Sequence, residues 1–223
     1  MLSTRLILLP LILSVSMAGC VTPMSMGDQI PTVNYRNDQK VLISVIDKRK
    51  RVQAGKPRNF VGVAHGVFGI PVDWHVRQVL ATEEGDKELD LSSWIQLRIV
   101  NGLNHEGWQT KAIDLSSLPD VDEAQSRMKQ EDASWMIALV LNEWYFTINL
   151  NWVTAFNFDT DTDIHVFHIN SGEVLQKNIK ERDVIDEQAS ESPQNNILRA
   201  YKAQLQQILN DRDLQNVLTH SAQ

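Results

Sequence analysis

The chain has 223 residues, 43% of them hydrophobic and 22% charged, which is an ordinary composition for a globular protein with one hydrophobic core. Its 21 basic and 28 acidic residues give a formal net charge of −7 at pH 7. This charge argues against a nucleic-acid partner, because such binding depends on a basic surface. The single cysteine leaves the folded part without a disulfide bond.

The first 19 residues have the layout of a secretory signal peptide. Arg5 supplies a positive charge, residues 6–13 form a short apolar run, and small residues follow. The run is too short for a membrane-spanning helix, and Pro10 interrupts it. We therefore expect residues 1–19 to direct export and to be removed.

The cysteine lies where a lipid anchor would need it. The segment Met17-Ala18-Gly19-Cys20 resembles the lipobox of bacterial lipoproteins, in which Cys20 would be acylated and become the new N-terminus. The alternative is an ordinary signal peptide that contains a cysteine by chance. Two or three acyl chains would hold the protein stably at a membrane. Because Val21 is not the Asp associated with retention in the inner membrane, we expect a lipid-anchored protein of the outer membrane that faces the periplasm.

The folded domain is expected to cover residues 39–223, behind a polar, acylated tether at residues 20–38. Its first strand is predicted over residues 41–46, where apolar and β-branched residues follow one another. A basic loop then follows in this acidic protein. It could contact anionic lipid headgroups or another acidic envelope polymer, or it could simply balance nearby acids. The basic residues of this loop are Lys48, Arg49, Lys50, Arg51, Lys56 and Arg58.

Residues 60–71 contain three glycines among apolar residues. Gly62, Gly66 and Gly69 have neither the dinucleotide-binding spacing nor the P-loop spacing, so nucleotide binding is disfavoured. An irregular strand or β-arm, in which the glycines allow sharp bends or positive φ, fits the pattern better.

The stretch from residue 136 to residue 180 is predicted to form the sheet around which the domain is organised. From Trp144 onward, even positions are apolar and odd positions polar, which is the period of a half-buried strand. Asn170-Ser171-Gly172 supplies a tight turn, so the stretch ends in a hairpin. The apolar face changes from odd to even positions near Asn142-Glu143, which a β-bulge or a strand buried on both faces would explain.

Capping residues and apolar spacing predict helices on both sides of this sheet. The expected elements are a helix capped by Asp90 or Ser92 that runs to about residue 105, a strand over 108–115, a helix over 121–133, a helix that begins at Ser192-Pro193, and a short helix over 213–218. Together the elements predict one α/β domain. It is a single-domain sandwich with a mixed sheet of about five strands, including a long antiparallel hairpin, and with two or three helices mainly on one face.

This succession resembles the YajG-like group of small outer-membrane lipoproteins. The matching features are the lipobox at Cys20, the strand over 41–47, the segment 61–69, the helix running into Glu106-Gly107-Trp108, the strand about Leu139, the hairpin at 172–175 and the closing helix with its continuation over 200–213. The resemblance implies an α/β sandwich on a lipid anchor, without an established activity. The architecture is also similar to the N-terminal domain of TolB, an analogy of fold that says little about function.

Two groups of potential metal ligands fail on spacing. Asp159, Asp161 and Asp163 imitate the start of an EF-hand loop, but the Gly and Glu that such a loop needs further on are missing. His165 and His168 are three residues apart, so in a strand they point to opposite faces. We therefore expect neither a metal nor another cofactor.

No catalytic residues are assigned, because no nucleophile motif is visible and paired acids lie in polar surroundings. Trp74 and Trp152 could be exposed anchors for a partner, and core packing is the alternative. The sequence thus predicts a non-enzymatic accessory or adaptor lipoprotein of the cell envelope that binds a protein or an envelope polymer. Two alternatives stay open: a small-ligand or lipid carrier with a cleft between sheet and helices, and an envelope hydrolase with an unrecognised site.

Overall fold

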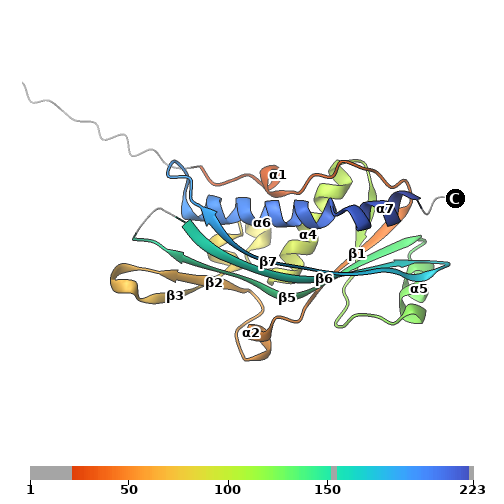
Figure 1. Cartoon of the computed structure of the whole chain (residues 1–223), viewed down its shortest axis with the longest axis horizontal. Helices are drawn as coiled ribbons and strands as arrows, with labels where there is room; N and C mark the ends of the chain where they lie inside the picture. Colours follow the sequence, from red (N-terminus) through yellow and green to blue (C-terminus); the bar gives the residue numbers. More distant parts are fainter. Residues whose placement is uncertain (1–21, 152–154, 221–223) are drawn as a thin grey trace, which may run out of the picture.

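The computed structural model describes residues 22–151 and 155–220. These residues form one α/β domain, in which a curled, mixed seven-stranded sheet is covered by helices (Figure 1). The strands are β1 Lys40–Asp47, β2 Phe60–His65, β3 Pro71–His75, β4 Gln109–Ala112, β5 Trp135–Asn149, β6 Ala155–His168 and β7 Gly172–Asp186. The α-helices are α1 Met26–Gln29, α2 Lys50–Gln53, α3 Val76–Val79, α4 Leu91–His105, α5 Val121–Gln130, α6 Pro193–Leu209 and α7 Arg212–His220, with single 3-10 turns at η1 Val67–Gly69 and η2 Glu84–Asp86. The predicted α/β class and the long hairpin are confirmed.

The 15-residue strand β5 organises the sheet, because it is hydrogen-bonded along both edges. Along one edge β6 runs antiparallel and continues through a tight turn into β7. Two strands share the other edge in succession: β1 pairs in parallel with Trp135–Leu141, and β2 pairs in parallel with Phe146–Asn149. A register shift between Leu141 and Glu143 falls between these two pairings, so the predicted β-bulge is confirmed.

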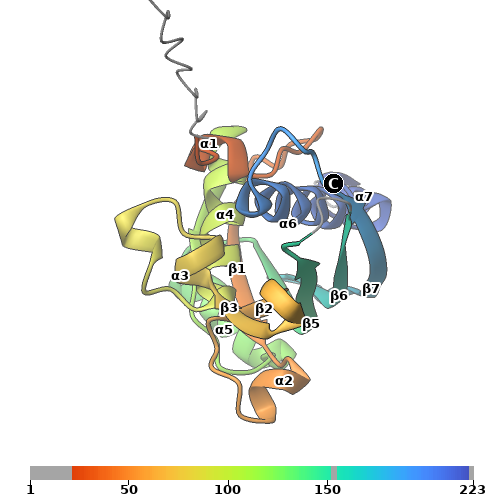
Figure 2. The ribbon, with the colours of Figure 1, turned by 90° about the vertical axis from the view of Figure 1, so that its left-hand side faces the viewer.

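The centre of the sheet is buried on both faces. Residues of α4, α6 and α7 form the main core on one face, whereas α5 packs over a smaller apolar cluster on the other (Figures 1 and 2). The alternation along β1 sends Val41 and Ile43 into the main core and Leu42 into the smaller cluster. A strand buried on both faces reads as a continuous apolar run, which is why no alternation is visible there in the sequence.

The caps that the sequence suggested are present. The carboxylate of Asp90 accepts a hydrogen bond from the Ser93 amide at 2.8 Å, and Ser192 caps α6 in the same way. Helix α5 ends at Gln130, three residues earlier than expected. Asp132 adopts φ 50°, a left-handed conformation that a right-handed helix cannot contain.

The segment before β1, which the sequence indicated as a tether, packs against the domain from Met24 onward. Gln29 is 1% exposed, and its side-chain oxygen accepts two hydrogen bonds from the guanidinium of Arg98 at 2.8 and 3.0 Å. Asn37 donates to the carbonyl oxygen of Leu218 at 2.9 Å. These polar side chains have specific partners far along the chain, so composition alone does not reveal that the segment is folded. None of the helices formed by the described residues is long and apolar enough to cross a membrane.

Candidate functional site

The predicted lipidation site, Cys20, and one of the two candidate partner tryptophans, Trp152, lie outside the described residues. The chain is held in place close to Cys20. Asn195, in the first turn of α6, donates to the carbonyl oxygen of Thr22 at 2.9 Å and accepts from the amide of Met24 at 2.9 Å. Thr22 is two residues after Cys20, and two extended residues span at most about 7 Å. Thr22 itself lies beside the start of α6.

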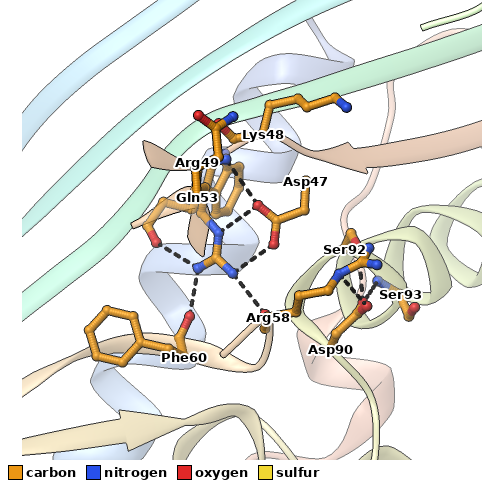
Figure 3. A network of polar contacts seen from close by, with 10 residues as sticks. Asp47, Lys48, Arg49, Gln53, Arg58, Phe60, Asp90, Ser92 and Ser93 are labelled. Carbon is orange, nitrogen blue, oxygen red and sulfur yellow. Dashed lines mark hydrogen bonds and ion pairs between the residues drawn. The ribbon is translucent and has the colours of Figure 1, made fainter. Parts of the chain in front are cut away.

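The predicted basic loop connects β1 to β2, and its first arginine fills the gap between these strands along β5 (Figure 3). The guanidinium of Arg49 binds Asp47 at two points, with Nε donating to Oδ1 and Nη2 to Oδ2, both at 2.9 Å. Its remaining donors reach the carbonyl oxygens of Phe60 at 2.6 Å and of Arg58 at 2.8 Å, and Nη1 lies 3.5 Å from that of Trp144. Arg49 thus connects the end of the loop, the start of β2 and β5 close to the bulge of β5.

Burial removes Arg49 from the predicted set of headgroup or partner contacts. Its side chain is 1% exposed and that of Asp47 is 0% exposed. A loop rich in basic residues is ordinarily interpreted as a solvated surface. The carboxylate at Asp47, two residues before Arg49, is the signal that would have suggested an internal pair.

Most of the other loop residues also have partners within the domain. Arg51 contacts Glu143 at 3.3 Å and lies over the ring of Tyr145 at 3.7 Å. Lys56 pairs with Asp73, Arg58 with Asp90 at 3.2 Å, and Lys48 donates to the carbonyl oxygen of Ser116 at 3.1 Å. These contacts support the alternative that the loop balances nearby acids.

Beside this junction lies a polar groove of about 580 Å³, the strand-end groove, between the carboxyl end of β1 and the start of α4. Its lining includes Asp47, Arg58, Asp90, Ser92, Gln96 and Ser116. Open α/β sheets bind ligands in this position, outside the carboxyl ends of their strands.

Two of the three acids that line the strand-end groove, Asp47 and Asp90, already serve the fold, and the third, Asp114, is exposed. Burial alone would raise the pKa of Asp90, but hydrogen bonds from Ser93 and Ser92, together with the charge of Arg58, outweigh it and hold that pKa below its ordinary value. Asp47 is bound by Arg49. The rim also carries hydroxyl and amide groups and the exposed carboxylate of Asp114, which can hold a polar ligand or peptide by hydrogen bonds.

The three acids of β6 line one face of the strand, as predicted, and are bound by its neighbours. Asp159 pairs with Arg182 at 2.8 Å, and Asp161 with Lys180 at 2.8 Å. Asp163 accepts hydrogen bonds from amide side chains of β5 and β7. Within residues 22–151 and 155–220, no group of three or more His, Cys, Asp or Glu side chains could hold a metal ion.

Trp74 is half-buried and packs edge-on against Phe146, with ring centroids 6.0 Å apart. It belongs to the margin of the main core rather than to a free surface. The exposed apolar side chains lie next to it, at the end of the β2–β3 hairpin, and the sequence had not indicated that they are exposed. We call this group the apolar tip: it consists of Val67, Phe68, Ile70 and Val72, which are 66%, 95%, 61% and 50% exposed. An uncharged run from Gly66 to Val72 was the available signal.

Comparison with known proteins gives no family for the chain. No family model matches it, and no curated protein matches its sequence. Similar solved structures include protein XCC0632 from Xanthomonas campestris, described as family-model DUF330, with 8% identity, a TM-score of 0.47, and coverage of 86% of this chain and 94% of that chain. Two others are the hypothetical protein CT253 from Chlamydia trachomatis (9% identity, TM-score 0.46, 82% and 99% coverage) and the lipoprotein GNA1162 from Neisseria meningitidis (7%, 0.27, 78% and 99%). The resemblance to the YajG-like lipoproteins stays a prediction.

Proposed function

We propose that the protein is a lipid-anchored accessory protein of the bacterial outer membrane that faces the periplasm and binds a protein or an envelope polymer through its folded domain. The observation that carries the proposal is the position of Thr22. The lipobox-like segment ends two residues before it, and Asn195 fixes Thr22 to α6. Because only Val21 separates Cys20 from Thr22, an acylated Cys20 holds the domain directly at the membrane surface rather than on a long flexible linker.

The strand-end groove is the surface that best fits a partner segment. It is open, and hydroxyl, amide, carboxylate and guanidinium groups line it, so it can form hydrogen bonds with an extended peptide or a glycan. Of its three acids, Asp47 and Asp90 are bound within the fold, which leaves only the exposed Asp114 and favours recognition over chemistry at this place.

A small-ligand carrier is the second candidate, because a volume of about 580 Å³ lies within the range of about 300–1,000 Å³ that is usual for ligand pockets. The polar lining favours a polar ligand over a lipid. Native mass spectrometry of the purified protein would detect a bound small molecule, and a mass equal to that of the bare acylated chain would count against a carrier.

The proposal is tested with the full-length chain in cells that produce it. Cys20→Ala is expected to release a folded domain from the membrane fraction, whereas the matched control Thr22→Ala keeps the cysteine and stays in the membrane. Pull-down from solubilised envelopes then compares the wild type with Arg58→Ala, at the groove, and with Arg212→Ala, an exposed arginine in α7. We expect a partner that is lost only with Arg58→Ala. The absence of any reproducible partner of the wild type would contradict the proposal.

A further inference from the structure

The apolar tip combines exposure with an unfavourable backbone conformation. Phe68 is 95% exposed and adopts φ 60° and ψ 19°, in the left-handed region that non-glycine residues rarely occupy. Neither feature stabilises the fold, because a bulky ring is left in water and the backbone is strained. Local violations of this kind are typical of sites that serve a function other than folding.

Several backbone groups of the apolar tip are hydrogen-bonded within the protein, so transfer of the tip from water to an apolar medium would leave few of them unpaired. The amide of Gly66 donates to the carbonyl oxygen of Ile70 at 3.0 Å, and that of Gly69 donates to the carbonyl oxygen of Gly66 at 3.0 Å. From the neighbouring end of β5, the side chain of Asn151 donates to the same carbonyl oxygen at 2.7 Å. No residue from Gly66 to Val72 carries a charge. Internally bonded backbone and uncharged side chains are what a segment needs in order to enter an apolar medium.

The tip and the start of the described chain lie at the same end of the molecule. In Figure 1 the β2–β3 turn, the facing ends of β5 and β6, and the chain leading into α1 all lie toward the left, away from α5 and α7. Figure 2 looks onto that end, and α1, β2 and β3 lie toward the viewer. The base of the hairpin, where β3 leads into α3, is close to the start of the described chain, because Val79 of α3 lines one cavity together with Pro23 and Asn195. Leu150, which is 43% exposed, adds a further apolar side chain beside the tip, bonded through its amide to His65.

We propose that the apolar tip inserts into the lipid bilayer that holds the anchor, so that the domain docks on the membrane at two points. This inference rests on the proposed function, since it needs the lipid on Cys20. The anchor brings the Thr22 end within about 7 Å of the bilayer surface, and the tip at that end then meets the same surface. Two points of attachment fix the orientation of the domain, whereas a lipid alone allows it to swivel. The strand-end groove then has a fixed orientation relative to the membrane.

The bilayer fits the tip better than a protein pocket or a second copy would. The exposed side chains form the end of a projecting hairpin and the adjoining turn, and they include no charged group that would set the register of a protein interface. An apolar projection that is fixed near a membrane gains from burial at the boundary of headgroups and acyl chains, about 5–10 Å deep.

The test places a fluorescent reporter on the tip of the full-length acylated protein. Phe68→Cys introduces a thiol for an environment-sensitive dye, because acylation blocks the thiol of Cys20. Ile70→Cys is a second reporter in the same turn, at a position with ordinary φ −64°. Ser126→Cys, exposed on α5 at the opposite end, is the matched control. The proteins are reconstituted in vesicles of phosphatidylethanolamine and phosphatidylglycerol, some of which carry spin labels on the acyl chains.

We expect dyes at positions 68 and 70 to shift to shorter emission wavelengths in vesicles and to be quenched by the spin-labelled lipids, with the dye at position 126 unchanged. Flotation of the same vesicles reports on the anchor separately. Protein that floats while the tip dyes behave like the control would overturn the inference but leave the proposed function intact. Protein that does not float would refute the anchor, and both proposals with it. Tip dyes that are shielded equally in detergent, with dimers formed, would assign the tip to a second copy and overturn membrane insertion.

Discussion

Asp47 and Arg49 form an ion pair between β1 and β2, the two strands that pair in succession with one edge of β5. The pair is closed to solvent, with side chains 0% and 1% exposed, and it lies where β1 ends, β2 begins and β5 bulges. The guanidinium of Arg49 also donates to the carbonyl oxygens of Phe60 and Arg58, so it supplies partners for backbone groups at this junction. Asp47 also lines the strand-end groove, so we expect a change at the junction to alter the groove.

Removal of Arg49 is expected to destabilise the domain strongly. Arg49→Met leaves a buried carboxylate without its partner, and such a change costs about 3–5 kcal/mol. Urea unfolding, followed by circular dichroism, measures the loss. Lys50→Met is the control, because Lys50 is exposed and has no ion pair within the described residues, and we expect a change within about 0.5 kcal/mol.

The double variant Asp47→Leu with Arg49→Met separates the ion pair from the backbone contacts. It removes both charges and is expected to recover part of the stability that Arg49→Met loses. Full loss in the double variant would show that the bonds to Phe60 and Arg58 carry the effect, and equal stability of Arg49→Met and wild type would contradict the account of the junction.

Gly102 tests whether the segment before β1 is part of the domain. A Cβ at this position would overlap the carbonyl oxygen of Pro31 and lie 2.9 Å from its ring. Overpacking costs about 1–3 kcal/mol, so Gly102→Ala should lower the free energy of unfolding although Ala favours a helix by about 1 kcal/mol. Gly85→Ala, with open space around it, is the control. If the segment were a loose tether, Gly102→Ala would instead stabilise α4, so the sign of the change decides.

The contact between β7 and the α6–α7 junction should make stability depend on pH in acid. Burial alone would raise the pKa of Asp211, but hydrogen bonds from Lys177 and from the amides of Leu214 and Asp213 hold it below its ordinary value. Because the pKa of this carboxyl is lower in the folded than in the unfolded state, its ionised form stabilises the fold above about pH 4. That stabilisation is lost as the pH falls through the pKa of the folded state. In Lys177→Met the fall in unfolding free energy below about pH 4 should be shallower than in wild type. Lys129→Met, exposed on α5, should retain the wild-type slope, and identical slopes for all three proteins would refute the assignment.

Phe68 should be dispensable for folding. Phe68→Asn removes a side chain that buries little and introduces a residue that tolerates φ 60°, so the free energy of unfolding should stay within about 0.5 kcal/mol or rise. Phe146→Ala, at a fully buried position of β5, provides the contrast with an expected loss of about 3–5 kcal/mol. Thermal unfolding of both variants measures this, and a large loss in Phe68→Asn would mean that the tip is structural.

Local patterns were enough to predict the framework of the fold. Period 2 along β6, the turn before Gly172, and the caps at Asp90 and Ser192 each depend on residues close in sequence, and all four are confirmed. The bulge near Glu143 was also visible, because it moves the apolar residues to the other set of positions. The order of the strands could not be predicted. β1 and β2 share one edge of β5, and these pairings join residues that are far apart in the sequence.

The candidate sites were harder to predict for the same physical reason. Whether Arg49 turns inward depends on carbonyl groups of β2 and β5, and whether Gln29 is buried depends on Arg98, so neither is encoded in a nearby pattern. The exposure of Phe68 follows from a hairpin that projects beyond the sheet, whereas an apolar run in the sequence ordinarily indicates burial.

The most direct test of the account is mass spectrometry of the N-terminal peptide of the mature protein, purified from membranes of cells that produce it. The account expects a chain that begins at Cys20 and carries the added mass of acyl chains. A mature chain that begins at another residue, or at an unmodified Cys20, would contradict it.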